Sequence, residues 1–223
     1  MIDIDRIFFI NLDHRTDRWE KIEKEFIPLI PDQYQDKVER FSAIDHTEYD
    51  TVEKRAAGCA YSQLAIWDKC IKENLNTVLI FEDDVKWNID RVGIYYYLNF
   101  LSSIDFDICN IGYRIENLMI PTEYDELIQT LEFVMACAYI VKVDFLKQIY
   151  SHVKDKADGM FYHGEDFRRN ALDISWLKFL FNREDNTLNK KWFLTREKLV
   201  TQYINHSNIM NCIHDTETDI LHR

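Results

Sequence analysis

The chain has 223 residues, of which 47% are hydrophobic and 14% aromatic, and its formal net charge is −12 at pH 7. This length fits one α/β domain, so we expect residues 1–223 to form a single domain. So acidic a surface repels phosphate backbones and argues against nucleic acid as a partner, although a bound divalent cation or a local basic pocket would still admit one nucleotide.

The five cysteines are odd in number and include no C-x-x-C pair. We interpret them as reduced, buried thiols, which fits a reducing compartment. Residues 1–6 are acidic and lack the pattern of a signal peptide, and the apolar runs are too short to span a bilayer. We therefore expect a cytoplasmic protein without stable membrane insertion.

Apolar patterning predicts strands that alternate with helices. The expected strands are residues 7–10, 38–44, 77–81, 106–111 and 136–141. The expected helices are residues 16–26, 59–74, 92–103 and 144–152. Such alternation is typical of an α/β fold with an open, mostly parallel, twisted sheet flanked by helices. From residue 158 onward the pattern is irregular, and we expect loops and short helices there.

Three adjacent carboxylates, Glu82, Asp83 and Asp84, directly follow the continuous apolar run at residues 77–81. In an open α/β sheet, the carboxyl ends of the strands form the ligand crevice. Glu82 and Asp84 are expected to face the same way and Asp83 to point elsewhere, because side chains alternate along a strand. Two carboxylates together with substrate phosphate are typical ligands of Mg²⁺ or Mn²⁺, so this strand end is a candidate metal site.

A metal that bridges two phosphates favours glycosyl or nucleotidyl transfer. A phosphohydrolase of the haloacid dehalogenase type also places acids after a buried strand. That chemistry needs Asp-x-Asp-x-Thr, whereas Glu82 takes the first position here and Lys86 the fifth. We discount the hydrolase for this reason.

Residues 8–18 read FFINLDHRTDR, residues 58–67 read GCAYSQLAIW and residues 79–85 read LIFEDDV. In this order they resemble the opening "INL-x-x-R-x-x-R" segment, the "G-x-x-x-SH-x-x-x-W" helix and the "LEDD" metal motif of glycosyltransferase family 25, the group of lipooligosaccharide and collagen galactosyltransferase-like proteins. Further segments with the same resemblance are residues 40–45, 106–112, 138–141 and 199–202 followed by 207–209.

The resemblance implies a GT-A fold with a Rossmann-like nucleotide-sugar-binding part, here roughly residues 1–112, and an acceptor side at roughly residues 113–223. It implies a UDP-galactose or UDP-glucose donor, Mn²⁺ or Mg²⁺ as cofactor, and inversion at the anomeric carbon. It also implies that Asp84 binds the metal directly and that Glu82 lies near the donor ribose or a metal-bound water. Gln63 stands where the family has histidine, which puts donor specificity or activity in question.

Several polar residues at strand ends are candidates for donor binding. Arg15 and Arg18 follow the first strand, where a guanidinium grips phosphate or pyrimidine oxygens through paired donors. The Asn11 amide could read a base edge or form a local turn, and Asp45 could touch the ribose or merely end a strand. The full candidate set is Asn11, Arg15, Arg18, Asp45, Gln63, Glu82 and Asp83.

An inverting transfer needs a general base for the acceptor hydroxyl. Asp166 and Glu165 follow the flexible Gly164, and Asp158 is the rival; all three could instead be polar surface residues. His206 and His214 are candidates to complete the metal shell, because GT-A enzymes often use a late histidine there.

The expected function is therefore metal-dependent, inverting transfer of a hexose from a UDP-sugar to a glycan, lipid-linked saccharide or protein hydroxyl. The alternatives are a catalytically degraded sugar-nucleotide-binding protein of the same fold and a metal-dependent phosphohydrolase or nucleotidyltransferase.

Overall fold

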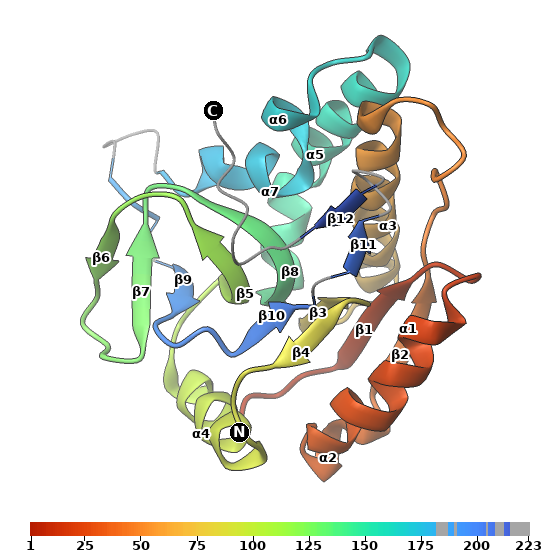
Figure 1. Ribbon diagram of the computed structural model, residues 1–223. Helices are drawn as coiled ribbons and strands as arrows, with labels where there is room; N and C mark the ends of the chain where they lie inside the picture. Colours follow the sequence, from red (N-terminus) through yellow and green to blue (C-terminus); the bar gives the residue numbers. More distant parts are fainter. Residues whose placement is uncertain (182–186, 190, 204, 208–211, 215–223) are drawn as a thin grey trace.

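The computed structural model describes residues 1–181, 187–189 and 191–203, and the backbone of residues 205–207 and 212–214. Its centre is one eight-stranded sheet in the order β2-β1-β3-β8-β5-β9-β7-β6 (Figure 1). In that order the strands are β2 (Val38–Ser42), β1 (Arg6–Asn11), β3 (Thr77–Glu82), β8 (Phe133–Lys142), β5 (Ile108–Ile115), β9 (Trp192–Thr195), β7 (Leu127–Thr130) and β6 (Met119–Pro121).

Helices pack on both faces of this sheet, so the molecule has three layers (Figure 1). The helices are α1 (Thr16–Lys21), α2 (Asp32–Gln35), α3 (Val52–Lys72), α4 (Arg91–Phe100), α5 (Val143–His163), α6 (Phe167–Asn170) and α7 (Leu172–Ser175). One core cluster joins the sheet to α3, α5 and α7. The other joins it to α4 and to the π-helical turn Ile22–Phe26 that extends α1. The predicted class, a sheet flanked by helices, is confirmed.

The sheet is mixed. β1 pairs in parallel with β2 and β3, as the alternation of strands and helices predicts. β8 runs antiparallel between β3 and β5, and β9 is parallel to β5. Because β8 runs antiparallel to β3, helix α5 starts at the opposite edge of the sheet from the Glu82 end of β3.

Two helices are longer than predicted. α3 begins at Val52, seven residues before the predicted start, and the Thr51 hydroxyl caps it by accepting a hydrogen bond from the Lys54 N–H. α5 continues to His163 and ends on Gly164, which has φ of 64°. The prediction of an irregular chain from residue 158 is thus wrong for the last turns of α5, because an interior glycine weakens a helix without ending one that packs against α3.

Two short ribbons lie beside the main sheet. β4 (Val85–Trp87) pairs with β10 (Val200–Gln202), and β11 (Asn205–Ser207) pairs with β12 (Cys212–His214). The first ribbon brings the C-terminal part of the chain directly against the segment that follows Glu82. Within the described part of the chain, no helix is both long and apolar enough to cross a membrane.

Candidate active site

The site is at the end of β3, at the edge of the sheet to which β1 and β2 also run. Glu82 ends the buried run of β3, and Asp84 lies in the turn before β4. The Gln202 side-chain amide nitrogen donates to Glu82 Oε2 at 2.7 Å and to Asp84 Oδ1 at 3.0 Å. The two carboxylates therefore address one point, as the alternation of side chains predicts.

Asp83 points away from that point and forms the support of the site. Its Oδ2 accepts from the Asn11 amide at 2.7 Å, and its Oδ1 lies 2.5 Å from Arg18 Nη1. Arg18 Nη1 is also 3.6 Å from Asp84 Oδ2, so its charge reaches two of the three acids. The side chains of Arg18 and Asp83 are only 11% and 8% exposed, which makes this a largely buried ion pair.

Asn11 connects this support to β2. Its side chain is fully buried, its amide also donates to the Arg15 carbonyl at 3.2 Å, and its Oδ1 accepts from Arg40 Nε at 2.8 Å. All polar atoms of the Asn11 side chain are thus used within the protein. Asn11 acts here as a brace for Asp83 rather than as an open contact for a base.

Negative charge is concentrated at this edge. Burial, followed by the charges of Asp84 and Asp83, raises the pKa of Glu82 well above its usual range, and burial and Asp83 raise the pKa of Asp84. The Cys59 thiol of α3 donates to Glu82 Oε1 at 3.7 Å, so both Glu82 oxygens have partners. With raised pKa values, these carboxylates keep their protons at pH values at which exposed carboxylates lose them. A bound cation would replace those protons.

The metal-free protein is therefore expected to lose stability as the pH rises. The pKa of Glu82 is about 8 in the folded protein and 4.5 as its ordinary value, so the folded state binds this proton more tightly. The resulting stabilisation is fully present below the unfolded pKa and is lost as the pH rises through the folded pKa. Urea unfolding in EDTA at pH values of about 5.5 and about 8 should show the loss in wild type and a smaller loss in Glu82→Gln. Equal losses in both proteins would contradict the assignment.

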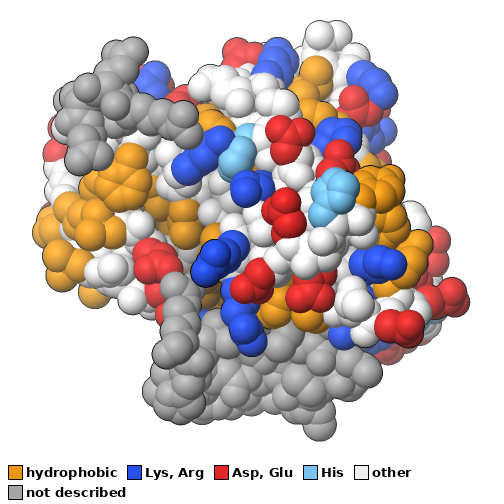
Figure 2. Space-filling model, turned by 90° about the horizontal axis from the view of Figure 1, so that it is seen from above, with side chains coloured by type: hydrophobic (Ala, Val, Ile, Leu, Met, Phe, Trp, Pro, Cys, Tyr) orange, Lys and Arg blue, Asp and Glu red, His pale blue; other side chains and the backbone are white. Residues whose placement is uncertain are grey.

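Arg15 lies at the rim of the site, and Asp45 follows the end of β2. Arg15 forms an ion pair with Asp17 at 2.8 Å, which raises the Arg15 pKa, with smaller contributions from Asp83 and Asp84. Asp45 accepts from Thr47 and lies 3.2 Å from His14 Nδ1. The end of the molecule toward which β1 runs shows acidic, basic and histidine side chains intermingled over its centre (Figure 2).

Gln63 is not brought into this group. Its side chain is fully buried, and its Oε1 accepts a hydrogen bond from the Tyr139 hydroxyl at 2.6 Å. Trp67 Nε1 donates to the same hydroxyl at 3.0 Å, while Gln63 Nε2 has no protein partner. The predicted donor contact of Gln63 would require this interior network to open.

The three predicted base candidates lie around the end of α5. Asp158 accepts from Tyr61 at 2.8 Å and pairs with Lys154 at 2.5 Å. Asp166 is the N-cap of α6 and accepts from the Arg168 N–H at 3.0 Å. Glu165 is exposed and packs its carboxyl against Gly159, where an added Cβ would meet it at 2.7 Å. Asp158 therefore lies in a helix and not in a loop, while Asp166 and Glu165 follow the helix end as predicted.

His206 and His214 lie in β11 and β12, of which only the backbone is described, so their predicted ligand role falls outside the described side chains. Among the described residues, no three histidine, cysteine or acidic side chains converge as a metal site would require. The carboxylates of Glu82 and Asp84 thus form at most part of a metal shell.

Part of the chain, including the acidic triplet, is similar to known proteins. Residues 49–106 match the sequence profile of Glycosyltransferase family 25 (LPS biosynthesis protein). A Drosophila melanogaster protein named "Glycosyltransferase 25 family member" is 32% identical over 108 residues. The chain resembles glycosyltransferase family 25. The match covers 39% of this chain and 17% of the Drosophila protein, so the chain spans a small part of that relative.

The family 25 segment contains the whole of α3, the acidic triplet and α4. A solved glycosyltransferase involved in the glycosylation of the major capsid of PBCV-1 has a similar fold, with a TM-score of 0.52 at 11% identity. That similarity covers 94% of this chain and 97% of the capsid glycosyltransferase chain, and it confirms the predicted GT-A type of α/β fold.

The sequence does not single out two residues that lie near the acids. Gln202 belongs to the closing segment that resembles family 25, but 118 residues separate it from Asp84 in the chain, so the sequence gives no sign of their contact. Asp173, in α7, accepts from the Met135 N–H at 2.8 Å and contributes to the raised pKa of Glu82. No local motif distinguishes either residue, because only the pairing of β4 with β10 and the packing of α7 on β8 bring them near the acids.

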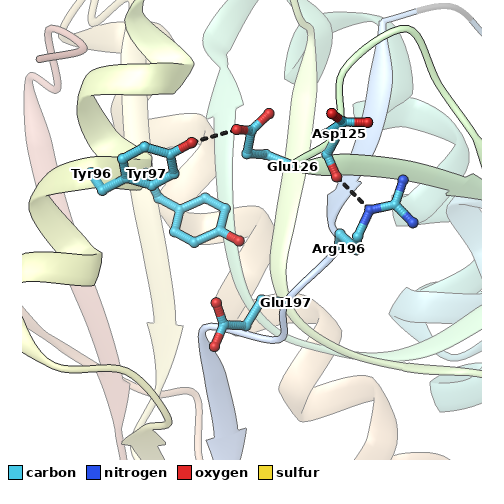
Figure 3. A pocket seen from close by; sticks show the side chains of 6 residues that line it. All are labelled: Tyr96, Tyr97, Asp125, Glu126, Arg196 and Glu197. Atoms are coloured by element: carbon cyan, nitrogen blue, oxygen red, sulfur yellow. Dashed lines mark hydrogen bonds between the residues drawn. The ribbon is translucent and has the colours of Figure 1, made fainter.

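A hollow of about 460 Å³ lies between α4 and the segments at residues 125–126 and 196–197 (Figure 3). It is lined by Tyr96, Tyr97, Asp125, Glu126, Arg196 and Glu197. The Tyr96 hydroxyl donates to Glu126, and Arg196 Nε donates to the Asp125 carbonyl, so much of its polar lining is already engaged. Tyr97 is buried, as expected of a packing residue, whereas Tyr96 is 52% exposed.

Proposed function

We propose that this protein is a divalent-metal-dependent glycosyltransferase that moves galactose or glucose from a UDP-sugar to a hydroxyl acceptor with inversion of configuration. The observation that carries the proposal is the convergence of Glu82 and Asp84 on a single amide nitrogen at the carboxyl end of β3. The names of the Drosophila relative and of the capsid glycosyltransferase support sugar transfer as the class of reaction.

The residues present fit a divalent cation. Two carboxylates that share one donor at 2.7 and 3.0 Å provide the oxygen ligands that Mn²⁺ and Mg²⁺ prefer, and substrate phosphate commonly supplies others. The Gln202 amide nitrogen occupies the point where a cation would bind, because it donates hydrogen bonds to both carboxylates. Half a turn of that amide would present its oxygen as a further ligand.

The chain's own residues then perform separate tasks. Asp84 and Glu82 hold the cation, which when bound would neutralise charge on the departing nucleoside diphosphate. Arg18, buried against Asp83, fixes the direction of the acidic turn and keeps a positive charge 3.6 Å from Asp84. Arg15, at the rim, has a guanidinium that can grip a phosphate by exchanging its partner Asp17 for the ligand.

The donor side of the proposal is tested by calorimetric titration of UDP into wild type, with Mn²⁺ and then with EDTA. We expect binding only with Mn²⁺, and none in Asp84→Ala under the same conditions. Asp3→Asn is the matched control, because it also removes one negative charge but from a side chain that is 92% exposed. A folded wild type that binds no UDP with Mn²⁺ would overturn the proposed donor.

Product analysis separates the alternatives. A glycosyltransferase incubated with UDP-galactose or UDP-glucose and Mn²⁺ releases UDP slowly even when water is the acceptor. A phosphohydrolase or nucleotidyltransferase would release inorganic phosphate or pyrophosphate instead. A degraded binding protein would bind UDP and release none of these products. The variant Gln63→His, which puts the family's histidine at this buried position, tests whether Gln63 is the cause.

A further inference from the structure

The Gln202 side chain lies between the two acids of the site and joins them. Its Nε2 donates to Glu82 Oε2 at 2.7 Å and to Asp84 Oδ1 at 3.0 Å. Two other side chains approach the same acids from other directions. Arg18 Nη1 is 3.6 Å from Asp84 Oδ2, and the Cys59 thiol donates to the second oxygen of Glu82 at 3.7 Å. The contact of Gln202 therefore marks the point that both acids face.

The main chain holds Gln202 at this point. β10 pairs with β4 in a register that puts Gln202 opposite Val85, directly after the acidic turn. The next residue, Tyr203, donates its N–H to the Asp84 carbonyl at 2.7 Å. Val200, at the start of β10, is fully buried in the core cluster that includes α4. Gln202 cannot leave the acids without breaking the β4–β10 ribbon, so a change at the site falls to its side-chain amide.

A primary amide carries donors and an acceptor on one planar group. The NH₂ end of Gln202 faces the acids, and no group in the described part of the chain donates a hydrogen bond to its Oε1. The terminal torsion of glutamine is broad and roughly two-fold, so a rotation of about 180° exchanges the two ends at low cost. The exchange would turn the oxygen toward the point between Glu82 and Asp84. Side-chain amide oxygens are ordinary ligands of hard divalent cations.

The metal shell needs protein oxygen beyond this pair. Mg²⁺ and Mn²⁺ prefer about six oxygen ligands, and the described histidine, cysteine and acidic side chains form no group of three that could hold a metal. The third acid, Asp83, is bound to Asn11 and Arg18. A glutamine oxygen adds a ligand without adding negative charge to an edge that already has three acids.

We propose that Gln202 is an exchangeable ligand of the metal site, an inference that rests on the function proposed above. Without a cation, its NH₂ bridges Glu82 and Asp84 and keeps the two acids together. When a cation binds, the amide turns and its Oε1 becomes a ligand. Because β10 holds Gln202, the cation then ties the C-terminal part of the chain to the acidic turn.

The first test is calorimetric titration of Mn²⁺ alone into wild type and Gln202→Leu, which removes both ends of the amide and keeps the size of the side chain. We expect Mn²⁺ to bind at least about tenfold more weakly to the variant, the smaller end of the loss for groups that only support metal ligands. An amide that only fills the point in the absence of a cation would compete with the metal, and its removal would strengthen binding. Unchanged or tighter binding in Gln202→Leu would therefore overturn the proposal.

Gln129→Leu is the matched control. Gln129 is also half-buried, and its Nε2 donates to two acceptors at 2.7 and 3.0 Å, here the main-chain carbonyls of Asn189 and Trp192. The variant removes equivalent hydrogen bonds without touching the acids, so its affinity for Mn²⁺ should be that of wild type. An equal loss in Gln129→Leu would mean that Gln202→Leu acts only through the stability of the fold.

Nuclear magnetic resonance of glutamine side chains labelled with ¹⁵N and ¹³C separates a ligand from a support of the acids. The Gln202 signals are those that Gln202→Leu lacks, and the Gln129 signals are the internal reference. Mg²⁺, at a concentration that displaces bound Mn²⁺, should shift the Gln202 amide protons upfield as they leave the carboxylates, and its carbonyl carbon downfield as the oxygen binds the cation. Amide protons that keep their shifts in Mg²⁺ would show that Gln202 only holds the acids.

Gln202→Glu covers the case in which Gln202→Leu does not fold. It retains an oxygen ligand, so it should bind Mn²⁺ at least as tightly as wild type, and weaker binding by the folded variant would count against the proposal. If wild type needs Mn²⁺ and Asp84 to bind UDP while Gln202→Leu binds Mn²⁺ as wild type does, the proposed function stands and only the role of Gln202 fails. If wild type binds no Mn²⁺, both fail.

Discussion

Asp84→Asn is expected to lower UDP release from the sugar donor by at least about 100-fold while the protein stays folded. A carboxylate that holds a catalytic cation contributes several kcal/mol of charge stabilisation, and each 1.4 kcal/mol is about tenfold in rate. The asparagine oxygen can still accept the hydrogen bond from Gln202, so the local fold should survive. The measurement is UDP release at saturating Mn²⁺, together with the Mn²⁺ concentration that gives half of the full rate.

Asp83→Asn is the matched control for this prediction, because it changes the adjacent residue and removes the same charge. Asp83 points to Arg18 and Asn11 rather than to the shared point, so its loss should cost stability more than metal affinity. The pair of variants therefore separates the two faces of the turn. If Asp84→Asn keeps wild-type release and Mn²⁺ dependence, the metal does not bind at this turn.

The elements that follow from short-range patterns could be predicted from the sequence. The apolar run at residues 77–81 predicts a buried strand, and β3 (Thr77–Glu82) contains that run and extends one residue beyond it. Strand alternation also predicts that Glu82 and Asp84 share a direction that Asp83 does not, which the shared contact of Gln202 bears out. These inferences succeed because they depend only on neighbours in the chain.

The features that depend on distant pairing could not be predicted in the same way. An apolar run predicts a strand at β8 but carries no sign that it runs antiparallel between β3 and β5. The bulge at Met135, and the contact of Asp173 with it across 38 residues, depend on that placement. The same is true of Gln202, which reaches Glu82 only because β10 pairs with β4.

Residue type alone does not predict the role of a side chain, even where the predicted fold is confirmed. Asn11, Arg15 and Arg18 occupy the predicted strand end, yet Arg18 and Asn11 are used to hold Asp83. A side chain with strong hydrogen-bonding groups at a ligand crevice can serve the protein as easily as the ligand, and burial decides between the two. Arg15, at the rim, is the one of the three that a phosphate could reach without disrupting that support.

Arg18→Met is expected to destabilise the protein by about 3–5 kcal/mol, the cost of removing one partner of a buried ion pair. The Arg18 and Asp83 side chains are 11% and 8% exposed, so methionine would leave Asp83 charged and out of reach of water. The measurement is the free energy of unfolding in urea near neutral pH, in EDTA so that metal binding does not contribute. A change of about 0.5 kcal/mol or less would show that water compensates Asp83, as it does for surface pairs.

The double variant Arg18→Met with Asp83→Asn decides the cause of that loss. Removing both charges leaves no uncompensated ion, so we expect the double variant to be more stable than Arg18→Met alone. The Asn11 amide can still donate to the oxygen of the new asparagine, which keeps one of the two bonds that hold the turn. If the double variant is instead as unstable as the sum of the single changes, the packing of the Arg18 side chain, and not its charge, supports the acidic turn.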